Sequence, residues 1–181
     1  MKKTLTLTVL VISFAFGTIL GKAQSQQQED ALRAATRDKL RVMLEAAGPK
    51  RGINISFRQS EKNPFNFVGV KRDGLTHEDF FEVVVGVSKD NTVVFKIYPH
   101  SKGSYLNVDK AKDSAGLTRL LLNLNSHNFL YWAADDSKDI CAMFMITLES
   151  GFPDKAMEVV LYSIAPLDQY VGQMLHFVDG S

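Results

Sequence analysis

The sequence contains little cysteine and almost no net charge. Its 181 residues include one cysteine, so no disulfide can form within the chain. The 21 Lys and Arg residues are balanced by 20 Asp and Glu residues, which gives a formal net charge of +1. Proteins that bind DNA or RNA need an excess of basic residues to neutralise phosphates, so this balance argues against a nucleic-acid partner. The cysteine, Cys141, lies among apolar residues, and we expect a buried, inert thiol.

The chain also lacks the motifs that mark common catalytic and cofactor sites. No G-x-S-x-G nucleophile elbow, G-x-G-x-x-G turn or P-loop occurs. The segment His77-Glu78-Asp79 is the nearest approach to a ligand cluster, but adjacent residues do not share one face of a helix or strand, so we interpret it as a solvated turn. We therefore expect no catalytic residues, no cofactor and no metal. The four histidines are far apart in the sequence: His77, His100, His127 and His176.

The acidic segment Asp135–Asp139 loosely resembles the start of a calcium loop. An EF-hand loop requires Gly at its sixth position and Glu at its twelfth, where this chain has Ile140 and Ile146. We therefore predict that the segment is a hairpin turn and not a cation site.

Long hydrophobic runs are confined to the N-terminus. Lys2 and Lys3 precede an uncharged run from Leu5 to Leu20, and Gly21-Lys22-Ala23 fits a signal-peptidase site. We expect a signal peptide over residues 1–23, with cleavage after Ala23. The mature protein would then be periplasmic or secreted. The alternative is an uncleaved anchor, although the run is shorter than the roughly 20 residues that span a bilayer. No membrane span is expected after cleavage.

Hydrophobic periodicity predicts a single α+β domain over residues 24–181. An amphipathic helix ends at Gly48-Pro49, and a second helix begins at Asp113 or Ser114. A third helix begins at Pro153, and Pro166 should kink or split it. Between them, alternating residues predict an antiparallel sheet of about five or six strands, with three helices packed on one face. The expected strands cover residues 53–57, 65–70, 81–87, 93–97, 129–134 and 139–149.

The second half of the chain carries a recognisable order of elements. A leucine-rich helix ends in Leu121-Leu122-Asn123-Leu124-Asn125, and an aromatic strand, an acidic hairpin and a long helix follow. In this the chain resembles the YbjN family of bacterial sensory transduction regulators. The resemblance covers roughly residues 65–175. It implies the fold of type III secretion chaperones and a dimeric, protein-binding role, and it supplies no catalytic residues.

Apolar and aromatic surface is what remains to carry a function. Tyr and Trp are enriched at interfaces, where one end of the side chain stays polar. We therefore expect an exported, non-enzymatic, protein-binding domain that forms a homodimer. The alternative is a cone-shaped domain with an apolar pocket for a small ligand or lipid, a fold that isomerases also use. A third hypothesis, a sensor domain, ranks below both. The expected partner-binding residues are Tyr98, Tyr105, Tyr131 and Trp132.

Overall fold

The computed structural model describes the backbone of residues 4–148 and 151–180, and side chains from residue 25 onward. The expected signal peptide, residues 1–23, therefore lies outside the residues that are fully described. Among residues 25–148 and 151–180, no helix combines the length and the apolar character needed to cross a membrane.

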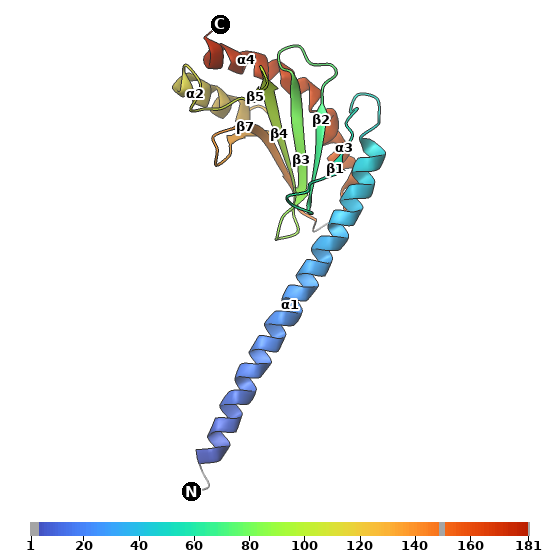
Figure 1. The fold of residues 1–181 in the computed structure, drawn as a ribbon, viewed down its shortest axis with the longest axis vertical. Helices are drawn as coiled ribbons and strands as arrows, with labels where there is room; N and C mark the ends of the chain where they lie inside the picture. Colours follow the sequence, from blue (N-terminus) through green and yellow to red (C-terminus); the bar gives the residue numbers. More distant parts are fainter. Residues whose placement is uncertain (1–3, 149–150, 181) are drawn as a thin grey trace.

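The domain is an α+β fold built on one antiparallel sheet, as the alternating segments predict (Figure 1). Strands β1, β2, β3, β4, β7 and β6 lie side by side in that order, and β5 pairs with the end of β4. The strands are β1 (Arg58–Gln59), β2 (Asn66–Lys71), β3 (Phe80–Val87), β4 (Val93–Ser101), β5 (Ser104–Tyr105), β6 (Tyr131–Ala134) and β7 (Ile140–Ile146). The two-residue strands β1 and β5 have no counterpart among the expected strands.

The helices pack on one face of this sheet. They are α1 (Thr4–Ala47), α2 (Ser114–Asn125), α3 (Asp154–Tyr162) and α4 (Asp168–Asp179). Each contributes buried apolar side chains to one hydrophobic core, which also takes in alternate residues of β3 and β4. In Figure 1 the sheet is seen from its other face, with α4 behind the strands.

Pro166 accounts for the fourth helix. The predicted C-terminal helix is split into α3, a 3-10 turn (Ala165–Leu167) that contains Pro166, and α4. Proline lacks the amide donor that an α-helix needs at this point, so the chain changes to a tighter turn before it resumes. Of the two outcomes that the sequence predicts at Pro166, a kink or a split, the structure shows a split.

The expected strand over residues 53–57 is wrong. Ile53 and Ile55 are fully buried, as their alternation indicates, but they do not join the sheet. Their amides donate to the carbonyl oxygens of Lys50 and Gly48, and Asn54 adopts a positive φ of 51°. The segment is therefore a turn that folds back on the end of α1, because local hydrogen bonds replace the strand pairing.

Strand β6 forms one edge of the sheet, and the side chain of Asn125 covers part of that edge. Asn125 Oδ1 accepts from the amide of Trp132 at 2.6 Å, and its Nδ2 donates to the Trp132 carbonyl at 3.0 Å. One amide side chain thus satisfies both main-chain groups that a neighbouring strand would bond. This protects the edge from pairing with other chains.

Replacement of Asn125 by alanine should destabilise the domain by about 1–3 kcal/mol, because both main-chain groups of Trp132 lose their partner. Asn123→Ala is the matched control, since the exposed Asn123 belongs to the same Asn-Leu-Asn segment and its side chain has no such role. Urea unfolding measures the difference. Equal stability of the two variants would contradict the edge-capping role.

Candidate functional site

The helices of the described residues all pack on one face of the sheet (Figure 1), and we call the opposite face the free face. Its side chains alternate with those of the core: Val83, Val85 and Phe95 are completely buried, while their neighbours on the strands are partly exposed. Cross-strand registers place the partly exposed side chains together on the free face. They are Val68, Val70, Glu82, Val84, Val94, Lys96, Tyr98, Met143, Met145 and Tyr131.

A row of rings in mutual contact crosses one end of the free face. The Phe80 ring stacks on the His100 ring, with their centroids 4.2 Å apart. The centroid of the His100 ring lies 4.0 Å from that of the Tyr105 ring. Tyr105 in turn meets Tyr98 edge to face at 5.6 Å. The Arg72 guanidinium covers the outer side of Phe80, 4.5 Å from its centroid. Such contacts hold each ring in place, so the row offers a rigid aromatic surface.

The polar ends of this row are held uncharged. Burial raises the pKa of the Tyr98 phenol, and nearby Cys141 and Asp135 raise it further. Burial also raises the pKa of Tyr105, which lies beside the Glu82 carboxylate. Burial lowers the pKa of His100, despite the opposing effect of nearby carboxylates. Near pH 7 the row therefore behaves as an apolar surface with polar edges, which is the character of an interaction surface.

The structure places three of the four expected partner-binding residues on the free face. Tyr98 is half-buried, Tyr105 is 37% exposed and Tyr131 is 56% exposed. Trp132 is a correction, because it is only 3% exposed and points into the core. Successive residues of a strand point to opposite faces, so Tyr131 and Trp132 cannot share one.

Cys141 also lies on a strand of this sheet, opposite Ala133, and it is completely buried. Burial raises the pKa of its thiol to about 11. The thiol is therefore protonated near pH 7, in agreement with the inert cysteine that its apolar surroundings predict.

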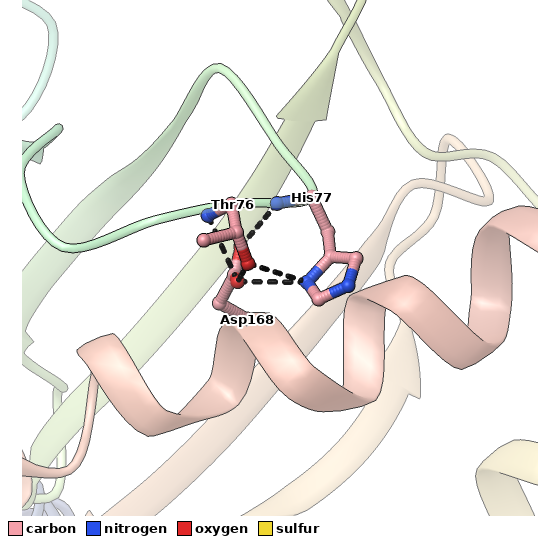
Figure 2. Close-up of polar contacts among 3 residues, drawn as sticks. All are labelled: Thr76, His77 and Asp168. Carbon is pink, nitrogen blue, oxygen red and sulfur yellow. Dashed lines mark hydrogen bonds and ion pairs between the residues drawn. The ribbon is translucent and has the colours of Figure 1, made fainter.

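Apart from the free face, a polar cluster joins the turn before β3 to the start of α4 (Figure 2). No pattern in the sequence predicts it. The Asp168 carboxylate accepts from the amide and the hydroxyl of Thr76 at 3.0 and 2.6 Å. It also accepts from the amide of His77 at 3.0 Å and lies 2.8 Å from Nδ1 of its ring. Asp168 is 6% exposed, and these bonds outweigh the effect of burial, so its pKa lies below the ordinary value.

Gly172 allows this arrangement. A Cβ atom at residue 172 would lie 2.7 Å from the His77 ring, so only glycine lets the imidazole lie against α4. Glycine inside a helix costs roughly 0.5–1 kcal/mol relative to alanine, and contact with the His77 ring explains its use here.

Glu78, next along the turn, is the fourth member of the cluster. Both carboxyl oxygens are buried and have no hydrogen-bond partner among the described residues. Burial, with the negative charge of Asp168 and Asp79, raises the pKa of Glu78 to about 9. The prediction of a solvated turn thus applies to the exposed His77 but is wrong for the carboxyl group of Glu78.

The cluster has the parts of an oriented base but not a complete catalytic site. Asp168 fixes the His77 ring, as the carboxylate of a catalytic triad does. The hydroxyl in contact with the ring, that of Thr76, lies on the same nitrogen as Asp168 and cannot be activated by Nε2. The four contacts that Thr76 and His77 make to Asp168 instead attach the turn to α4. Among residues 25–148 and 151–180, no group of three His, Cys, Asp or Glu side chains could hold a metal ion.

The acidic segment Asp135–Asp139 is a hairpin turn between β6 and β7. Asp135 Oδ1 accepts from the amides of Ser137 and Asp139, and Lys138 adopts a positive φ of 67°. The carboxylate is used to close the turn, which confirms the hairpin that the sequence predicts.

Comparison with known proteins gives no further assignment: no family model, no curated protein and no solved structure matches this chain.

Proposed function

We propose that this protein is a non-enzymatic, polypeptide-binding module of the bacterial envelope or exterior, chaperone-like and dimeric, as its resemblance to the YbjN family implies. The observation that supports this most is the free face. Valine, methionine and tyrosine side chains dominate it, and Met145 and Tyr131 are 60% and 56% exposed. Large apolar side chains on a sheet are normally covered, so their exposure favours a partner.

The occupant that fits the free face best is a second copy of the chain. Glu82 and Lys96 lie on neighbouring strands of this face, near its centre, and carry opposite charges. In a two-fold dimer the same patch meets itself. A two-fold axis between these strands would place Glu82 of one copy opposite Lys96 of the other, while the valines and methionines around them bury one another.

Met145→Lys should abolish this self-association, because it places a hydrated charge in the apolar part of the free face. Val159→Lys is the matched control: Val159 is 59% exposed, close to the 60% of Met145, but lies on α3 in the helical layer. Sedimentation equilibrium should show a dimer for the natural chain and for Val159→Lys, and a monomer for Met145→Lys. A monomeric natural chain, or a dimer that Val159→Lys dissociates, would contradict the proposal.

The cone-shaped ligand-binding alternative has less support, because the space between sheet and helices is filled. Phe81, Phe95 and Met157 meet there with no exposed surface. A groove of about 700 Å³ lies outside this core, between α1 and Phe152.

A further inference from the structure

A groove of about 430 Å³ lies at the end of the free face where β3 and β4 are joined, and we call it the hairpin groove. Helix α1, the loop before β2 and the hairpin itself form its walls, and strands β3 and β4 form its floor. Its volume falls in the range of small-molecule sites. It is lined by Arg33, Asn63, Asn66, Val84, Gly86, Val87, Ser88, Lys89, Val94, Lys96 and Tyr98.

The charges that line this groove have one sign. Arg33, Lys89 and Lys96 contribute to it, and no Asp or Glu does. None of the three cations is ion-paired to a carboxylate within the described part of the chain. Three unpaired cations around one hollow create a positive potential that attracts an anion.

Arg33 is already held in a fixed position. Its Nε and Nη2 donate to the carbonyl oxygen of Val87 at 3.1 and 2.8 Å, and its guanidinium lies 3.7 Å from the centroid of the Phe65 ring. A guanidinium has five N–H donors, so the remaining ones stay available. A fixed guanidinium binds carboxylate or phosphate with little further loss of entropy.

The floor of the groove is apolar. Val84 and Val94 lie on β3 and β4, and the Tyr98 ring lies at the far end of the groove from the hairpin. Gly86, between the valines and the hairpin, adds no side chain of its own. A bound anion would therefore have apolar surface to lie on beyond its charged end.

We propose that the hairpin groove binds a small amphiphilic oxyanion. Its carboxylate or phosphate is held by the cations Arg33, Lys89 and Lys96, and its apolar body lies over Val84 and Val94. The groove shares Val84, Val94, Lys96 and Tyr98 with the free face, so a bound anion competes with the proposed self-association. The anion site does not depend on that association.

The test measures binding to the full chain by calorimetry and by amide chemical shifts. The probes are 4-phenylbutyrate, 3-phenylpropyl phosphate, inorganic phosphate and the neutral 4-phenylbutanol. 4-Phenylbutyrate or 3-phenylpropyl phosphate should bind at least tenfold more tightly than inorganic phosphate and 4-phenylbutanol do. The affinities of these two amphiphilic anions show whether the groove prefers a carboxylate or a phosphate. The largest shifts should fall at residues 86–89 and 94–96. Equal binding of all four probes, tighter binding of inorganic phosphate, or no binding would overturn the proposal.

Variants separate the groove from general charge attraction. We expect two variants, Lys96→Met and Lys89→Met, each to lower the affinity for the preferred probe about tenfold, because each removes one cation of the groove. Lys155→Met, on the exposed surface of α3, removes the same charge elsewhere and should leave the affinity unchanged. A loss of affinity in Lys155→Met equal to that in Lys96→Met would show a nonspecific effect and contradict the assignment. Because Lys89 is exposed and Lys96 half-buried, neither variant disturbs the core.

Discussion

Replacement of Asp168 by alanine should lower the free energy of unfolding by about 2–4 kcal/mol, because each amide left without an acceptor costs about 1–3 kcal/mol. The carboxylate accepts two main-chain amides, one hydroxyl and one imidazole contact, all from Thr76 and His77. Without it, the turn before β3 loses its attachment to α4, and two amides lose their acceptor. Chemical denaturation of the variant measures the change.

Two further variants make this test specific. Asp136→Ala removes an exposed aspartate from the β6–β7 turn and should change stability by less than about 0.5 kcal/mol. Asp168→Asn keeps an acceptor oxygen but loses the charge. Its free energy of unfolding should therefore lie between those of Asp168→Ala and Asp136→Ala. An Asp168→Ala variant as stable as Asp136→Ala would show that the cluster does not hold the turn in place.

The wild-type protein should lose stability as the pH rises from about 5 to 8, and Glu78→Gln should remove most of this loss. The pKa of Glu78 in the folded state, about 9, lies above that of an unfolded glutamate. Its contribution is therefore fully favourable at low pH and becomes unfavourable as the pH rises toward 9. At about 1.4 kcal/mol per pH unit, the loss between pH 4.5 and 7 is about 3 kcal/mol.

Thermal or urea unfolding across pH 4 to 9 tests this slope. Glu61→Gln is the control, since Glu61 is exposed and its replacement should leave the slope of the natural chain intact. Asp168 has the opposite linkage: its pKa is lowered, so its contribution is present near neutral pH and is lost only as the pH falls through the folded-state value. If Glu78→Gln and the natural chain show the same slope, the Glu78 carboxyl is not buried in solution.

The parts of the fold that depend on local chemistry could be predicted from the sequence. Alternation in Phe80–Val87 indicates a strand buried on one face, the Asp113 side chain caps α2 by accepting from Gly116, and Pro166 splits the last helix. Residues 53–57 alternate in the same way but form a turn, since alternation reports burial and does not reveal which groups the amides will bond. The short strands β1 and β5 were missed because two residues are too few to show a periodicity.

The sites were less predictable, because they depend on contacts between distant residues. Tyr98, Tyr105 and Tyr131 could be proposed from their chemistry, and the free face brings them to one side of the sheet. The error over Trp132 could have been avoided, since it is adjacent to Tyr131 in a strand and must point to the other face. Asp168 lies 91 residues from His77 along the chain, and no local pattern indicates that they meet.

The proposed association through the free face is tested most directly by an intermolecular NMR measurement in a mixed sample. One half of the chains carries 13C-labelled methionine methyl groups, and the other half is unlabelled in methionine and protonated at its tyrosines. Met143 and Met145 lie on the free face, whereas Met157 and Met174 are completely buried in the core and act as internal controls. The account predicts intermolecular cross-peaks from the methyl groups of Met143 and Met145 to tyrosine rings of the other chain. Cross-peaks that connect the two chains elsewhere, or none at all at millimolar concentration, would contradict it.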